Sequence, residues 1–300
     1  LFRELYELAH KDDDLYILAN LTHNPDFSRI AYDFSARFID ISANEHSALT
    51  MCEALIQKGN SVVLCVDIPS FLVRWFEQLL SLLPTLSGKL IIIGLPHNPT
   101  SADLFYHNVR PEILLMHAIP TMVIVTPGTH EELGTLLTHA HAASILSYFH
   151  INYLQRAPTI EPSNTIPRLF EPIEYLQGKQ ALCIGIGEGL SKAHQARLHL
   201  EEYGYSTALL SIPTVQPLNE SALHKYLHAY SAFFVFEDDM LPLKISTKIG
   251  NFIAENLERK IIFRSFHPTK NVDFRAATLE ILELMVQSNI IPNNQEWHGK

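Results

Sequence analysis

Glycine, cysteine and positive charge are scarce in this chain of 300 residues. It has 12 Gly, three Cys, and 22 Lys and Arg against 32 Asp and Glu, which gives a formal net charge of −10. A nucleic-acid-binding surface needs clustered positive charge to release phosphate counterions, so no general affinity for nucleic acid is expected. No apolar run reaches the ~18 residues that a membrane-spanning helix requires, so no membrane association is expected either.

The cysteines argue against both a disulfide framework and a metal site. Cys52, Cys65 and Cys183 are widely separated and odd in number. The first residues of the sequence lack the basic region followed by an apolar region that forms a secretory signal. Reduced core thiols in a cytoplasmic protein are therefore expected. His139 and His141 stand two residues apart and would point to different sides of a helix, so no metal ligand is expected there.

Strand-like apolar runs alternate with helix-length amphipathic runs along the chain. This alternation predicts an α/β fold with two tandem, doubly wound domains and mostly parallel sheets. The first domain is expected over residues 1–156 and the second, with four strands, over residues 179–300. Between them, residues 157–178 contain several prolines and lose the periodicity, which predicts a stiff linker. The expected strands are near residues 15–19, 38–41, 61–66, 89–94, 121–125, 144–148, 181–186, 206–212, 232–236 and 260–264.

Glu45 is the first candidate for chemistry. It closely follows the predicted strand in the segment Arg37-Phe38-Ile39-Asp40-Ile41-Ser42-Ala43-Asn44-Glu45-His46. Open α/β folds bind ligands outside the carboxyl ends of their strands. A carboxylate at the start of a helix is also favoured by the helix dipole alone. Position by itself therefore leaves a functional and a structural interpretation open.

The same segment resembles the RF.D.GIAEQ signature of the pyrimidine-binding domain in transketolase-group thiamine-diphosphate enzymes. Residues 70–78, Ser-Phe-Leu-Val-Arg-Trp-Phe-Glu-Gln, resemble the TFLQRAYDQ helix start of the 1-deoxy-D-xylulose-5-phosphate synthase family. Residues 119–127 resemble that family's IPEMVIMTP. Counted back from there, Asp103 and His107 match the Asp and His of its GADGQTHQ loop.

The resemblance continues into the second domain. Residues 212–220 are similar to the family's RFVKPLDE, and residues 235–239 to its VTVEEN strand end. The chain is thereby identified as a pyrimidine-binding domain, a linker and a transketolase C-terminal domain. The order and spacing of the motifs carry this identification.

The resemblance implies a site for thiamine diphosphate. Glu45 would hydrogen-bond the aminopyrimidine ring, and Phe71 would pack on that ring. Arg74 and Asp103 would also contribute to the cofactor site, with Arg74 near the substrate. His107 would handle protons at the reacting carbonyl. The cofactor would serve as the electron sink for transfer of a two-carbon aldehyde or ketone unit.

Half of such a site is missing from the sequence. None of the 12 glycines forms the Gly-Asp-Gly that, with a later Asn, binds the diphosphate and magnesium in this family. The resemblance therefore implies a diphosphate-binding partner, either a separate subunit or a missing N-terminal half. Magnesium would bind only through that partner, in a homo- or hetero-oligomer, and the chain alone is not expected to be active.

Departures from the family pattern keep an alternative open. Ser101 and Leu104 replace glycines of the His107 loop, and Pro96 replaces an expected arginine. The family's phosphate-binding VRYPRG reads Leu-Ser-Tyr-Phe-His at residues 146–150. The chain could accordingly be a catalytically decayed scaffold or dimerisation subunit of the same fold. An unrelated α/β binding protein is the third hypothesis.

The run Gly185-Ile186-Gly187-Glu188-Gly189 resembles a dinucleotide-binding loop, because it follows a predicted strand and opens a helix. It lacks the last glycine of that motif, and no acidic residue ends the next predicted strand. Nucleotide binding at this loop is therefore not expected.

Overall fold

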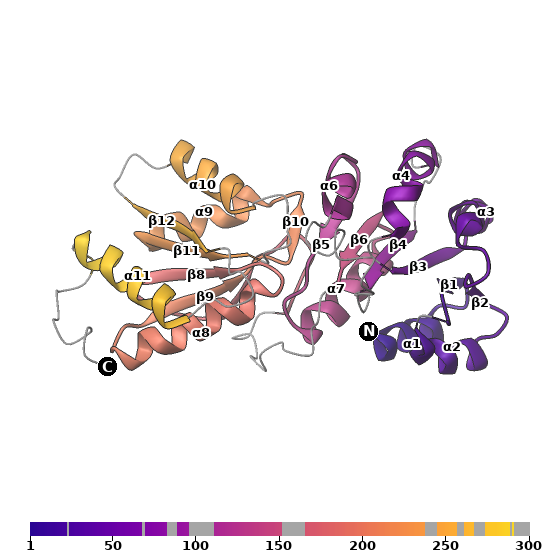
Figure 1. The fold of residues 1–300 in the computed structure, drawn as a ribbon, viewed down its shortest axis with the longest axis horizontal. Coiled ribbons are helices and arrows are strands. Elements are labelled where there is room, and N and C mark those ends of the chain that lie inside the picture. The colour runs from indigo at the N-terminus through magenta and orange to yellow at the C-terminus, as the bar shows by residue number, and fades with distance from the viewer. Residues whose placement is uncertain are drawn as a thin grey trace. The chain divides into compact units, whose positions relative to one another are not determined.

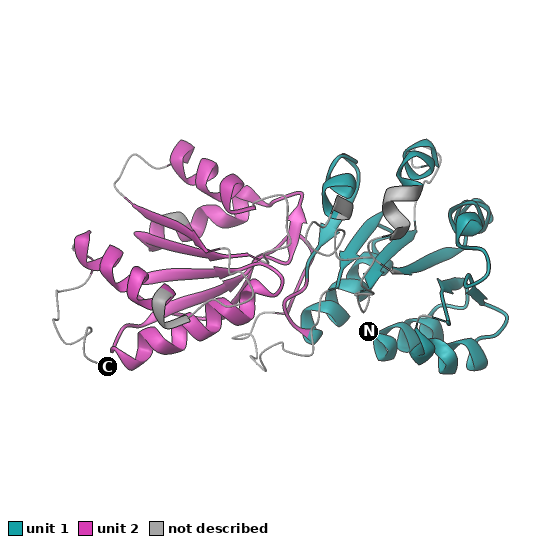
Figure 2. Cartoon of the chain, viewed as in Figure 1, with its two compact units in different colours: residues 1–126, 130–152 teal, residues 127–129, 153–300 magenta. Residues whose placement is uncertain are grey.

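The computed structural model describes residues 1–22, 24–67, 70–82, 89–95, 111–151, 166–237, 245–256, 261–266, 274–288 and 290. The chain divides into two compact units (Figure 2). The first is residues 1–126 with 130–152, and the second is residues 127–129 with 153–300. Each unit has the predicted α/β architecture. In the described part of the chain, no helix is long and apolar enough to cross a membrane.

The first unit is built on parallel strands in the order β5-β6-β4-β3-β1-β2. Strand β4 is buried at every position, without polar alternation, as expected of a strand covered on both faces. Helices α3, α4 and α6 lie along one face of the sheet and α1 and α7 along the other (Figure 1). The elements are α1 (Phe2–Lys11), β1 (Leu15–Ala19), η1 (Pro25–Phe27), α2 (Ser28–Asp33), β2 (Phe38–Asp40), η2 (Glu45–Ser47), α3 (Ala48–Gln57), β3 (Ser61–Asp67), α4 (Ser70–Leu82), β4 (Leu90–Leu95), α6 (Pro111–His117), β5 (Val123–Val125), α7 (His130–Ala142) and β6 (Ser147–His150).

The direction in which the chain adds strands reverses between β1 and β3. From β1 the chain passes to β2 on one side, and from β2 it crosses through α3 to β3 on the other side. Open α/β sheets bind ligands outside the carboxyl ends of their strands at such a reversal. Asn20 directly follows β1 and Asp67 is the last residue of β3, so their backbones lie on the two sides of this reversal.

The second unit contains a sheet in the order β12-β11-β8-β9-β7, parallel except where β7 pairs antiparallel with β9. Its core is aromatic and aliphatic, and the rings of Phe236 and Phe266 stack with centroids 4.9 Å apart. The elements are β7 (Ile173–Leu176), β8 (Ala181–Gly185), α8 (Gly189–Glu202), β9 (Thr207–Ser211), β10 (Thr214–Gln216), α9 (Glu220–Ala229), β11 (Ala232–Phe236), α10 (Ile245–Asn256), β12 (Ile262–Phe266) and α11 (Phe274–Gln287).

Short elements depart from the sequence prediction. Strand β7 lies inside residues 157–178, where a linker was predicted, and the sheet drawn through the described residues has five strands instead of four. Ile173 and Tyr175 are fully buried, and Glu174 and Leu176 are not, so the segment has the alternation of an edge strand. Strand β10 and helix α2 were also missed, because three and six residues are too few to show a period.

The glycine-rich loop of the second unit is required for packing. A Cβ on Gly189 would lie 2.0 Å from the carbonyl oxygen of Phe236, and one on Gly185 would lie 2.3 Å from Leu190 Cα. Gly187 has a φ of +56°, in the left-handed region that glycine adopts without strain. Close approach of backbones and one turn therefore account for these glycines without a bound nucleotide.

All three cysteines are buried thiols, as predicted for core residues. Desolvation raises the pKa of Cys183 to about 12, against smaller opposing effects of Thr207 and Arg197. Desolvation also raises the pKa of Cys52. Both side chains therefore stay protonated at neutral pH and are poor nucleophiles and metal ligands.

Candidate functional site

Glu45 lies in the loop that follows β2, in contact with Asn20 at the carboxyl end of β1. It opens the 3-10 turn η2, and the α-helix α3 begins only at Ala48, later than the sequence predicted. Its side chain is half-buried. The carboxylate is therefore partly shielded from water at the edge where an α/β sheet binds ligands.

Hydrogen bonds fix one oxygen of the Glu45 carboxylate. Asn20 Nδ2 donates to Glu45 Oε1 at 2.6 Å, and the Asn20 side chain is only 5% exposed. The Ser42 hydroxyl lies 2.9 Å from Asn20 Oδ1 and 2.5 Å from Asp40 Oδ1. Side chains from the ends of β1 and β2 thus form a continuous path of contacts to Glu45.

Asp40 organises the two loops that meet at this edge. Its Oδ1 accepts the N–H groups of Leu21 at 3.2 Å and of Ser42 at 3.0 Å. Desolvation acts to raise the pKa of Asp40, but the bonds from Ser42 and Leu21 outweigh it and hold the pKa below its usual value. Ser42 Oγ also accepts the N–H of Thr22 at 3.1 Å. Asp40 and Ser42 therefore join the loop after β1 to the loop after β2.

Arg37, the first residue of the signature segment, has a structural role at the opposite ends of these strands. Its guanidinium donates to the carbonyl oxygens of Asp12 at 2.7 Å, Ala9 at 3.0 Å and Leu15 at 3.3 Å. Helix α1 ends at Lys11, so the carbonyls of Ala9 and Asp12 belong to its C-terminal end, and that of Asp12 also accepts the N–H of Leu15 at 3.3 Å. A positive charge there is also favoured by the helix dipole.

Replacing Arg37 with methionine should lower the free energy of unfolding by about 2–3 kcal/mol, because several carbonyls lose a charged donor. Cofactor affinity of the folded protein should stay unchanged. Urea denaturation of the purified chain measures the first quantity. Arg29→Met is the matched control, because Arg29 is 79% exposed and its guanidinium lies 3.7 Å from Asp33. Equal stability of the Arg37 and Arg29 variants would refute the structural role.

Helix α4 approaches the turn that carries Glu45. Trp75 Nε1 donates to His46 Nδ1 at 3.3 Å, and the Trp75 side chain is 3% exposed. On the same helix, Phe71 lies one turn before Trp75 and Arg74 lies one residue before it. The structure does not describe the side chains of Phe71 and Arg74. The backbone of α4 thus brings both predicted residues to the same edge as Glu45.

The remaining predicted residues, Asp103 and His107, lie outside the described residues. Conversely, the structure adds Asn20 and Ser42, which the sequence analysis did not single out. Asn20 is the first polar residue after the apolar strand Leu15–Ala19. A search for polar residues directly after every predicted strand would have found it.

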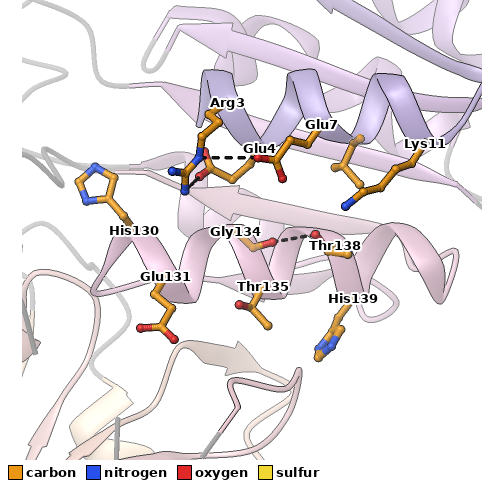
Figure 3. A pocket seen from close by; sticks show the side chains of 11 residues that line it. Arg3, Glu4, Glu7, Lys11, His130, Glu131, Gly134, Thr135, Thr138 and His139 are labelled. Atoms are coloured by element: carbon orange, nitrogen blue, oxygen red, sulfur yellow. Dashed lines mark hydrogen bonds and ion pairs between the residues drawn. The ribbon is translucent and has the colours of Figure 1, made fainter. Parts of the chain in front are cut away.

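A hollow of about 350 Å³ lies elsewhere in the first unit, between α1 and α7 (Figure 3). Its lining mixes charges of both signs, and Arg3 pairs with Glu4 at 3.0 Å and Glu7 at 3.9 Å. None of the predicted site residues lines it. This mixed lining gives no argument for a particular ligand.

Sequence comparisons place this chain among transketolase-like proteins. Residues 174–278 match the family model described as "Transketolase, C-terminal domain". A 1-deoxy-D-xylulose-5-phosphate synthase of Helicobacter pylori (strain G27) is 24% identical over 260 residues, which are 84% of this chain and 41% of the relative. A synthase of Clostridium acetobutylicum is 23% identical over 265 residues, which are 85% of this chain and 41% of the relative. The chain thus spans about two fifths of the length of these relatives.

Solved structures show the same fold. A chain described as "Split gene transketolase, inactive beta4 tetramer" superposes with a TM-score of 0.71 at 15% identity, covering 94% of this chain and 96% of that one. Transketolase from Campylobacter jejuni superposes with a TM-score of 0.62 at 13% identity, covering 95% of this chain and 44% of that one. Residues 174–278 are a transketolase C-terminal domain, and the fold of the chain as a whole is transketolase-like, with 1-deoxy-D-xylulose-5-phosphate synthases among the proteins it is similar to.

Proposed function

We propose that this chain is the C-terminal half of a split transketolase-like or 1-deoxy-D-xylulose-5-phosphate-synthase-like enzyme. In this proposal it transfers a two-carbon aldehyde or ketone unit once a second chain supplies the diphosphate-binding domain. The position of Glu45 at the carboxyl ends of the strands, where the strand order reverses, carries the proposal. Its Oε1 is bound by Asn20, and among the described residues none bonds its Oε2.

The residues present fit the pyrimidine half of a thiamine diphosphate site. A half-buried carboxylate with an available oxygen can hydrogen-bond a ring nitrogen and exchange a proton with it. Thiamine diphosphate would supply the electron sink for the two-carbon fragment. Phe71, Arg74 and Asp103 are proposed to contact the cofactor, and His107 is proposed to move protons at the substrate carbonyl.

The chain corresponds in length to part of some relatives and to nearly the whole of another. The chain covers 96% of the split-gene transketolase chain but only 41% of the H. pylori synthase. In the described part of the chain, no group of three or more His, Cys, Asp or Glu side chains is placed to hold a metal ion. The proposal assigns Mg²⁺ to the partner, because the Gly-Asp-Gly…Asn motif is lacking in this sequence and would be carried by the partner, in a cytoplasmic homo- or hetero-oligomer.

Co-expression tests the proposal. The chain would be produced alone and together with a candidate diphosphate-binding chain, and both samples would be assayed for two-carbon transfer between ketose or 2-oxo-acid donors and aldehyde acceptors. We expect activity only from the co-expressed pair. A stable pair that binds no thiamine diphosphate would contradict the proposal and favour the decayed scaffold or dimerisation subunit.

A further inference from the structure

We propose that Asn20 is the positioning residue of Glu45: its amide fixes Glu45 Oε1 and thereby directs Oε2 toward the bound ring. This inference rests on the proposed function and names a residue that governs the same site. It starts from the 2.6 Å bond between Asn20 Nδ2 and Glu45 Oε1. Bonds from an amide to a carboxylate are stronger than those between neutral groups.

Asn20 is held by a rigid part of the fold. It directly follows β1, whose last residue, Ala19, pairs with Asp40 of β2 in a parallel register. The carbonyl oxygen of Ala19 also accepts the N–H of Ile41 at 3.0 Å. Residues at the ends of paired strands hold a site more accurately than residues in long loops. Because the paired strands hold Asn20 in place, Asn20 can fix the position of the Glu45 side chain, which lies in a loop.

The Glu45 carboxylate sets the orientation of the Asn20 amide. An ionised carboxylate only accepts hydrogen bonds, so the amide must turn its NH₂ group toward Glu45 and its oxygen away. That oxygen lies 2.9 Å from the Ser42 hydroxyl, whose single proton is shared with Asp40 Oδ1 at 2.5 Å. The bond to Glu45, and not the contact with Ser42, therefore selects one of the two amide orientations.

The proposed role distinguishes the two oxygens of Glu45. With Oε1 engaged, rotation of the carboxyl group is restricted, and Oε2 remains for the ligand. Removing the amide donor would leave Glu45 in place on η2 but with a freely rotating carboxylate. A displacement of this kind near a reacting group typically costs about 10- to 100-fold in productive binding or rate.

A double-mutant cycle tests this role in the assembled complex. The variants are Asn20→Leu, which keeps the approximate volume without a donor, Glu45→Ala, which removes the carboxylate that the amide binds, and the double substitution. We expect Asn20→Leu to weaken thiamine diphosphate binding about 10- to 100-fold beside native Glu45, and by less than about 3-fold when it is added to Glu45→Ala. Effects that simply add would overturn the proposal, because a merely structural residue would act equally in both backgrounds.

Two further measurements distinguish a failure of the Asn20–Glu45 contact from a failure of the proposed function. Gln78→Leu removes another side-chain amide, which donates to Thr50 at 3.1 Å, and should leave cofactor affinity unchanged. In the chain alone, the NMR signals of the Asn20 side-chain amide should shift on Glu45→Gln without any cofactor, and no shift would refute the contact itself. If they shift but the native complex binds no thiamine diphosphate, the proposed function has failed, and the cofactor role of Asn20 fails with it.

Discussion

Gly189→Ala should destabilise the second unit by at least about 3 kcal/mol or prevent it from folding. The new Cβ would lie 2.0 Å from the carbonyl oxygen of Phe236, 2.6 Å from its carbonyl carbon and 3.0 Å from the N–H nitrogen of Glu237. These are backbone atoms at the end of β11, next to the start of α8, so no side chain can rotate away to make room. Relief would require α8 to move away from the sheet.

Gly134→Ala is the matched control for this effect. Gly134 lies within α7, and its new Cβ would meet the Glu4 side chain at 3.0 Å, which is flexible and can move. Alanine favours a helix interior over glycine by about 1 kcal/mol, so this variant should be as stable as the native chain or more stable. Denaturant unfolding of both variants, with hydrogen exchange to locate the loss, measures the difference. Native-like stability of the Gly189 variant would show that α8 is not packed as described.

Glu45→Gln should reduce two-carbon transfer by the assembled complex about 100- to 10,000-fold, the usual contribution of a positioned acid–base group. The glutamine side chain has nearly the same shape, and its oxygen can still accept the Asn20 amide. It cannot exchange a proton with a ring nitrogen. The loss should therefore appear in turnover and cofactor binding, while stability and assembly remain native.

Glu53→Gln provides the comparison for Glu45→Gln. Glu53 lies on α3, the helix that follows Glu45, and accepts a hydrogen bond from Gln57 at 3.2 Å. Glu53→Gln therefore removes one negative charge, as Glu45→Gln does. We expect full activity from this variant. Full activity from the Glu45 variant as well would mean that the carboxylate is a structural residue, as its position before a helix alone would allow.

The sequence patterns predicted the long elements and missed the short ones. Strand β4 was predictable because Leu90–Leu95 is a continuous apolar run with glycine as its one small residue. Strand β7 was hidden because it follows Pro172 and shows its alternation over four residues only. Such brief segments become strands through pairing with a neighbour, and β9 lies far along the chain. The strand propensity of a short segment does not show which distant strand it will pair with.

The sequence also predicted only part of the candidate site. Glu45 stood out because a motif of ten residues surrounds it, and the structure places it at the expected edge of the sheet. Its roles and those of Phe71 and Arg74 remain predictions. Asn20 could have been singled out as a polar residue directly after a strand, but its contact with Glu45 could not, because the two meet only when β1 and β2 pair and bring together residues 25 positions apart. Arg37, in contrast, belongs to the signature segment in the sequence, but in the structure its guanidinium contacts backbone carbonyls.

Calorimetric titration of thiamine diphosphate with Mg²⁺ tests the central claim most directly, using this chain alone, the co-expressed complex, and the complex that carries Glu45→Gln. The claim is that Glu45 belongs to a cofactor site that a second chain completes. It predicts no measurable binding to the chain alone, saturable binding to the complex, and much weaker binding to the Glu45 variant. Equal affinity of the native and Glu45→Gln complexes, or equally tight binding to the chain alone, would contradict it.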